Sequence, residues 1–156
     1  MSEYPEKTDK VSPSAAARSA RLSAVQAVYQ STQNKQSLRN LAAEYLEHRS
    51  NMEIEGEALV RPDGALLKGI LYGVDERLPE LVAIVDANLK KDATDRDVEP
   101  LLKSILICGA YELMVGKSDT PLIINDYLHV AHAFYERSEV GLVNGVLDSI
   151  SKIFDH

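Results

Sequence analysis

Apolar residues recur every three or four positions along most of the chain after residue 12, which is the spacing of an amphipathic helix. The first such run starts at Ser12-Pro13, because serine caps helices well and proline suits the first helical turn. It extends to about Gln30, and we expect a polar loop from Ser31 to Ser37. A second run follows from Leu38 to about Arg49. The first third of the chain is therefore predicted to form two helices.

Prolines mark the starts of most later helices, because proline fits the first helical turn but interrupts a helix interior. We expect helices to begin at Pro62-Asp63, Pro79, Pro100 and Thr120-Pro121, and a last helix to carry the apolar residues from Leu142 to Phe154. Residues 50–64 have no clear period and are interpreted as a long connection, and residues 90–97 as a charged linker. Strand-like alternation extends over a few residues at most. The predicted fold class is all-α, with about seven helices around one core.

Length and composition are those of a globular domain. The 156 residues are 45% hydrophobic and 26% charged, which is enough apolar side chain for a packed core. We expect a flexible tail over residues 1–11 and a single domain over residues 12–156. No apolar run approaches the roughly 18 residues that a membrane span needs, and the polar first residues do not resemble a signal peptide. With a single cysteine, these features predict a cytoplasmic protein without membrane association.

Charge is unevenly distributed along the chain. The net charge is -7, yet residues 10–43 contain five basic residues and no acid. Such a segment suggests a local anion-binding face on an acidic body. A chance cluster on a solvated helix explains the pattern equally well, so charge alone leaves both interpretations open.

Two motifs resemble reactive sites but have simpler interpretations. Gly116-Lys117-Ser118 looks like the end of a phosphate-binding loop, but position 111, where that motif needs a glycine, is a tyrosine. A glycine that ends a helix is therefore favoured. Cys108 lies in an apolar run and is predicted to be a small buried hydrophobic residue instead of a nucleophile.

Two histidines form a third motif of this kind. His129, His132 and Glu136 could share one face of a helix, as zinc ligands would. No fourth ligand completes the site, so a pair of surface histidines is favoured. Because no catalytic signature is evident either, we expect a protein that is not an enzyme and has neither a metal nor a cofactor.

The first predicted helix carries side chains suited to RNA. Arg18 and Arg21 can form bidentate contacts with phosphate, and the ring of Tyr29 can stack on an unpaired base. Arg21 and Tyr29 would lie about 12 Å apart along the helix, which is comparable to about two or three nucleotides of extended strand. Salt-bridged arginines beside a core tyrosine are the alternative, and spacing alone favours that alternative.

The last predicted helix contains a second polar pair. Asn144 and Asp148 are four residues apart and share a helix face, where they could hydrogen-bond to base edges or a phosphate. Gly141 and Gly145 would allow a ligand or a backbone to approach closely. Two polar positions on a core helix are the default interpretation of this pattern.

Four segments are specific enough to indicate a family. They are SAVQAVYQ (23–30), ICGAYEL (107–113), PLIINDYLHVAHAF (121–134) and LVNGVLDSI (142–150). In this order and spacing they resemble the NusB family of transcription antitermination factors, over about residues 12–154. The resemblance implies an all-helical fold of two small packed sub-bundles and a role without catalysis.

The resemblance also implies partners and RNA-binding residues. NusB proteins pair with NusE, a ribosomal small-subunit protein, and the pair binds the boxA element of nascent RNA, notably in ribosomal RNA operons. Within the antitermination complex, this pair helps RNA polymerase to resist termination. Carried over from the family motifs, the RNA-binding residues are Arg18, Arg21, Gln26, Tyr29, Asn144 and Asp148. Three departures from the family pattern together favour binding through the NusE complex: fewer arginines before the first motif, Gly141-Leu142 in place of a basic residue and a phenylalanine, and Ile107 in place of an arginine.

Two other functions remain open at this stage. The N-terminal region of rRNA cytosine methyltransferases resembles NusB, but we expect no methyl-donor domain because none follows His156. A scaffold that binds only protein is the other alternative, since the acidic body and the tyrosine-bearing helices suit such an interface. The sequence also leaves open whether the chain forms a homodimer through its partner surface.

Overall fold

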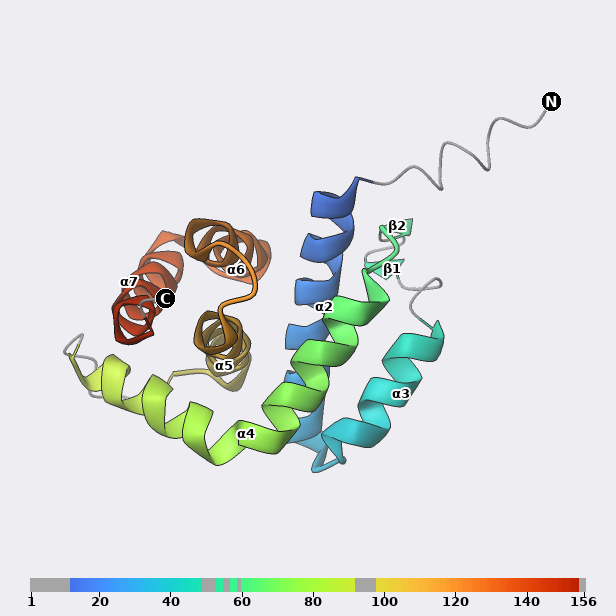
Figure 1. Ribbon diagram of the computed structural model, residues 1–156, viewed down its shortest axis with the longest axis horizontal. Coiled ribbons are helices and arrows are strands. Elements are labelled where there is room, and N and C mark those ends of the chain that lie inside the picture. Colours follow the sequence, from blue (N-terminus) through green and yellow to red (C-terminus); the bar gives the residue numbers. More distant parts are fainter. Residues whose placement is uncertain (1–11, 49–52, 55–56, 59, 92–97, 155–156) are drawn as a thin grey trace.

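The computed structural model describes residues 12–48, 53–54, 57–58, 60–91 and 98–154. Within these residues it contains six helices and one small hairpin (Figure 1). The helices are α2 (Pro13–Asn34), α3 (Leu38–His48), α4 (Gly64–Lys91), α5 (Pro100–Val115), α6 (Thr120–Phe134) and α7 (Arg137–Ile153). The predicted all-α class is confirmed. The tail over residues 1–11 lies outside the described residues, so that tail and the single domain over residues 12–156 stay predictions.

Two of the expected helix starts, at Ser12 and Asp63, are confirmed by side-chain caps, while α5 and α6 begin at Pro100 and Thr120 without one. Ser12 Oγ accepts a hydrogen bond from the backbone N–H of Ala15 at 3.1 Å, and Asp63 Oδ1 accepts one from Leu66 at 3.1 Å. The end of α2 differs from the prediction, because the helix continues to Asn34 and is closed by Lys35 in the left-handed conformation. The last turn is polar and therefore has no apolar period to detect.

The predicted break at Pro79 is a kink within one helix. Arg77, two residues before this proline, has non-helical dihedral angles (φ -118°, ψ 20°). Proline lacks an N–H group and its ring clashes with the preceding turn, so the helical geometry is interrupted at Arg77 and α4 consists of two helical halves joined at a kink, where a new helix was expected. The described residues therefore contain six helices where the sequence predicted about seven.

The kinked helix connects two groups of helices. Figure 1 shows the first half of α4 beside α2 and α3, and its second half running below α5 and α7. The helices α5, α6 and α7 pack against one another and form the second group. This arrangement corresponds to the two sub-bundles implied by the family resemblance.

The connection before α4 contains two short strands that the sequence did not predict. Strand β1 (Glu53–Ile54) pairs antiparallel with β2 (Glu57–Ala58). Strands of two residues are too short to produce a visible alternation of apolar and polar positions. The end of the connection is joined to α2, because Ser19 donates a hydrogen bond from Oγ to the carbonyl of Val60.

Helix α5 lies at the centre of the core. It packs against α2, α4, α6 and α7, and its buried residues therefore lie on all faces of the helix. Cys108 is fully buried within it, as predicted, and burial together with the charge of Glu112 raises the pKa of its thiol.

In the part of the chain that the structure describes, no helix combines the length and the apolar character needed to cross a membrane.

Two glycines provide a test of this packing. A Cβ added at Gly69 in α4 would have no neighbour within 4 Å, so Gly69→Ala should raise the free energy of unfolding by about 0.5–1 kcal/mol. A Cβ at Gly109 in α5 would lie 2.9 Å from Leu147 Cδ2 in the core. Gly109→Ala should therefore lower stability by about 1 kcal/mol or more, because overpacking exceeds the gain in helix propensity. Urea denaturation of both variants measures the change in the free energy of unfolding. A change of the same sign in the two variants would contradict this packing.

Candidate nucleic-acid interface

The largest polar feature of the core is a buried arginine. The side chain of Arg21 is 2% exposed and projects from α2 between α5 and α6. Its Nε and Nη2 atoms donate to the two carboxylate oxygens of Glu112 at 2.7 and 2.8 Å. Its Nη1 atom donates to Asp126 Oδ2 at 2.8 Å. One guanidinium therefore joins three helices.

A tyrosine completes this cluster. Tyr127 is fully buried, and its hydroxyl donates to Glu112 Oε2 at 2.7 Å. Burial alone would lower the pKa of Arg21, but the hydrogen bonds and charge of Glu112 outweigh it and raise that pKa above its ordinary value. Burial and the charge of Glu112 raise the pKa of Tyr127. Arg21 is therefore charged and Tyr127 neutral; we call Arg21, Glu112, Asp126 and Tyr127 the Arg21 cluster.

Small residues on α2 make room for this arrangement. Ala20, Ala24 and Ala27 are fully buried and lie on the side of α2 that faces the core. Their short side chains let the neighbouring helices approach closely. The carboxylates come from isolated acids in two apolar runs, ICGAYEL and PLIINDYL. Salt-bridged arginines, the alternative that spacing favoured, are therefore found at Arg21, but its two acids were not predicted, and the available signal was an acid in an otherwise buried run.

Arg18 lies one turn before Arg21 and has a different environment. Its side chain is 42% exposed, and its Nε atom lies 3.5 Å from Asp126 Oδ1. That nitrogen is buried and forms no hydrogen bond with any described residue. The end of the Arg18 side chain therefore reaches solvent, while its inner part lies beside the Arg21 cluster.

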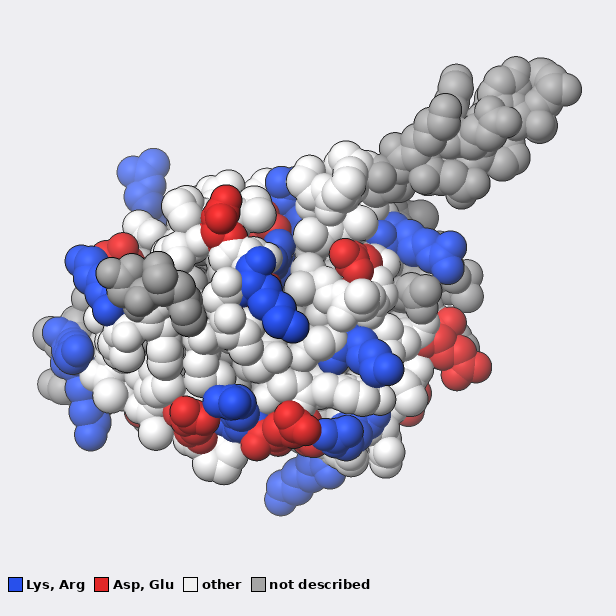
Figure 2. All heavy atoms as spheres, in the orientation of Figure 1, with Lys and Arg blue, Asp and Glu red and all other residues white. Residues whose placement is uncertain are grey.

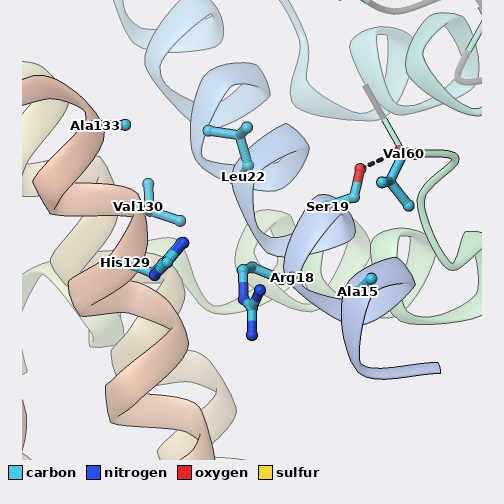
Figure 3. A pocket seen from close by; sticks show the side chains of 8 residues that line it. All are labelled: Ala15, Arg18, Ser19, Leu22, Val60, His129, Val130 and Ala133. Atoms are coloured by element: carbon cyan, nitrogen blue, oxygen red, sulfur yellow. Dashed lines mark hydrogen bonds between the residues drawn. The ribbon is translucent and has the colours of Figure 1, made fainter. Parts of the chain in front are cut away.

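Arg18 also lines a pocket of about 210 Å³ between α2 and α6 (Figure 3). The lining residues are Ala15, Arg18, Ser19, Leu22, Val60, His129, Val130 and Ala133. Most of them are apolar. Arg18 contributes a charged guanidinium and His129 an imidazole ring. The pocket thus combines an apolar wall with a positive charge at its edge.

The other predicted residues of α2 lie further along the helix. Gln26 is half-buried, and Tyr29 is 36% exposed. Tyr29 lies near Tyr135, whose hydroxyl donates to Glu99 Oε1 at 2.7 Å. Burial and this contact raise the pKa of Tyr135, so its phenol is neutral. Tyr29 therefore presents part of an aromatic ring to solvent beside a second tyrosine.

The polar pair on α7 is separated from these residues. Asn144 and Asp148 are exposed, and Asp148 Oδ2 lies 3.4 Å from Lys152 Nζ. Helix α7 packs against α4, α5 and α6, and α5 and α6 lie between it and α2 in Figure 1. The six predicted RNA-binding residues are thus one buried arginine, three residues along α2, and an exposed pair on α7.

The basic N-terminal segment offers less open positive charge than its composition suggests. Arg21 is buried, and Arg39 on α3 contacts Asp75 and Glu76 at 2.8 and 3.4 Å. Figure 2 shows acidic and basic side chains side by side along the lower edge of the molecule, over α4. Among the described residues of this segment, Arg18 and Lys35 are therefore the basic residues with a solvent-exposed side chain and no strong ion pair, and Arg18 is the one that lines the pocket.

The structure also decides between the interpretations of the other motifs. Gly116 ends α5 with φ 65°, and its N–H donates to the carbonyl of Glu112, which confirms a helix C-cap. His129 and His132 are exposed on α6, but that helix ends at Phe134. Tyr135 is extended, so the face that Glu136 was expected to share with the histidines does not form. Among the described residues, no group of three or more His, Cys, Asp or Glu could hold a metal ion.

Comparison with known proteins decides the family. Residues 18–152 match the family model described as the NusB family. The chain belongs to the NusB family. A "Transcription antitermination protein NusB" from Novosphingobium aromaticivorans is 37% identical over 134 residues, covering 85% of this chain and 90% of that protein. One with the same name from Nitrobacter hamburgensis is 34% identical over 137 residues, covering 86% and 85%.

The NusB fold is confirmed by a solved structure. NusB from T. maritima superposes with a TM-score of 0.66 over 90% of this chain and 92% of that chain. The two sequences are 20% identical, so this likeness concerns the fold. The helical NusB fold is therefore formed here around the Arg21 cluster.

Removal of Arg21 should destabilise this NusB-family chain strongly. Arg21→Leu leaves Glu112 and Asp126 buried without their partner, and we expect the free energy of unfolding to fall by about 3–5 kcal/mol. Tyr127→Phe removes one hydrogen bond to a charged acceptor and should cost about 1.5–3 kcal/mol. Urea denaturation gives both values.

Arg18→Leu is the matched control for the Arg21 variant. It removes an arginine one turn earlier on α2, but one whose end is solvated, so the expected loss is about 1 kcal/mol or less. Equal losses for the two arginine variants would contradict the assignment of Arg21 to the core.

Proposed function

We propose that this chain is a non-catalytic transcription antitermination factor that binds boxA RNA together with NusE. Support comes from its membership of the NusB family. The relatives that match most of the chain are named as transcription antitermination proteins. In this proposal the complex acts on nascent transcripts in the cytoplasm, notably those of ribosomal RNA operons, and helps RNA polymerase to resist termination.

The observation that carries the proposal at the level of residues is the position of Arg18. Its guanidinium reaches solvent at the edge of a pocket, and the Asp126 carboxylate beside it also binds Arg21 on its inner side. A phosphate approaching the outer edge of Arg18 therefore meets a cation whose neighbouring acid is buried and shared with a second arginine. Such a site is suited to charge-assisted contacts with an RNA backbone.

The remaining RNA contacts are assigned to Gln26 and Tyr29 on α2 and to Asn144 and Asp148 on α7. Tyr29 offers a partly exposed ring on which a base can stack. The exposed pair on α7 would contact a strand that continues around the second sub-bundle. For Arg21 we propose an indirect role, in which it holds α2 against Glu112 and Asp126 without touching RNA.

Binding of labelled boxA RNA, measured by fluorescence anisotropy with and without NusE, tests this function. A scrambled RNA of the same length is the reference, and each titration is made at two salt concentrations. We expect boxA to bind more tightly than the scrambled RNA, and NusE to strengthen that preference. Because Arg18 is the basic side chain assigned to phosphate, the slope of log K against log salt should be shallow for this chain alone, at about -0.7 for each phosphate neutralised.

Arg18→Ala should weaken binding and make the salt slope less negative by about 0.7, the share of one phosphate on a single strand. Arg39→Ala is the control, because Arg39 is an exposed arginine of the same sub-bundle that pairs with Asp75 and Glu76 and does not line the pocket. No discrimination between boxA and scrambled RNA in either condition would overturn the proposal. A NusE complex that forms without RNA would then favour a scaffold that binds only protein.

A further inference from the structure

The pocket between α2 and α6 holds two flat side chains at its edges. Arg18 enters from α2 and His129 from α6, and they lie on facing sides of the pocket (Figure 3). The apolar residues Leu22, Val130 and Ala133 line the space further along the same two helices. His129 is exposed and was assigned no role in the RNA contacts above.

The size and chemistry of the pocket restrict its ligand. Its volume of about 210 Å³ is below the roughly 300–1,000 Å³ of pockets that enclose drug-sized molecules, so it suits one small ring system. Among the eight described residues that line it, none is acidic. The hydroxyl of Ser19 is already donated to the carbonyl of Val60. The pocket therefore offers flat faces and apolar contact, with few groups to read the edge of a ligand.

Arg18 is held in place on its inner side. Its Nε atom is buried 3.5 Å from Asp126 Oδ1, so the guanidinium is restrained while its outer edge is solvated. Unstacked RNA bases are commonly held between aromatic rings, including histidine, and the planes of arginine guanidinium groups. A restrained guanidinium loses less conformational entropy when a base stacks on it.

We propose that this pocket receives one unstacked base of the bound RNA, which stacks between Arg18 and His129. The proposal rests on the RNA-binding function proposed above and adds His129 to the RNA site. Because few polar groups face the pocket, stacking accepts any base, and the adjacent phosphate is bound by the outer edge of Arg18. The presence of a base therefore matters more at this position than its identity.

Histidine variants test the pocket against a matched control. His129→Ala should weaken binding of boxA RNA about fivefold or more, because base stacking on one side is lost. His129→Phe keeps a ring and should retain most of the affinity. The control is His132→Ala, which removes an exposed histidine of the same helix that does not line the pocket, and it should bind as the wild type does. Unchanged thermal unfolding of all three variants shows that the fold is preserved.

A series of boxA RNAs, each with one abasic nucleotide, locates the base. At one position, loss of the base should weaken binding to the wild-type protein more than His129→Ala does, because stacking on Arg18 is lost together with stacking on His129. That RNA should bind wild type and His129→Ala equally, because the same contact is removed only once. Exchange of the base for another at this position should change the affinity by about twofold or less.

The outcomes separate this proposal from the function on which it rests. If wild type does not prefer boxA, the proposed function fails and the base pocket fails with it. If boxA is preferred but His129→Ala matches His132→Ala and no abasic position is coupled to His129, the function stands and the pocket proposal is overturned. If His129→Ala loses affinity for NusE and keeps its affinity for RNA, the pocket proposal is also overturned, because the pocket then binds a side chain of NusE.

Discussion

The pairing of a buried guanidinium with two carboxylates is the constraint on which this structure depends. Arg21 loses nearly all its water on folding, and that desolvation is offset only because Glu112 accepts two hydrogen bonds and Asp126 a third. The acceptors come from α5 and α6, and the donor from α2. Any shift of these helices breaks a charged hydrogen bond in a low-dielectric interior, so the cluster fixes how the two sub-bundles meet.

The same cluster determines what the surface can offer to an anion. Asp126 lies between two arginines, one on the inner side and one on the outer side. Arg21 binds one oxygen of Asp126 at 2.8 Å, whereas Arg18 Nε lies 3.5 Å from the other, and the outer edge of the Arg18 guanidinium stays open to solvent. The buried cluster and the pocket between α2 and α6 thus share Asp126 as a neighbour, which connects the packing of the helices to the proposed binding of RNA.

The acidic composition of the chain is compatible with an anionic ligand because of where the acids lie. Asp75 and Glu76 contact Arg39 on the first sub-bundle, and Asp86 lies 2.9 Å from Lys103. The pocket has no acid among its described lining residues. The positive charge of Arg18 at the pocket edge therefore faces solvent, whereas its nearest acid, Asp126, is buried, and repulsion from more distant acids is screened at physiological salt.

The sequence by itself determined the helices, several of their caps and the family, because helical period, capping residues and motif order are local or linear properties. It could not separate Arg18 from Arg21, which have the same side chain three positions apart. Their different environments depend on acids 91 and 105 residues further along the chain, and only the tertiary structure brings these to α2. Packing likewise decided the kink in α4, the two-residue strands and the position of His129 across the pocket from Arg18. Each depends on neighbours that no local pattern identifies.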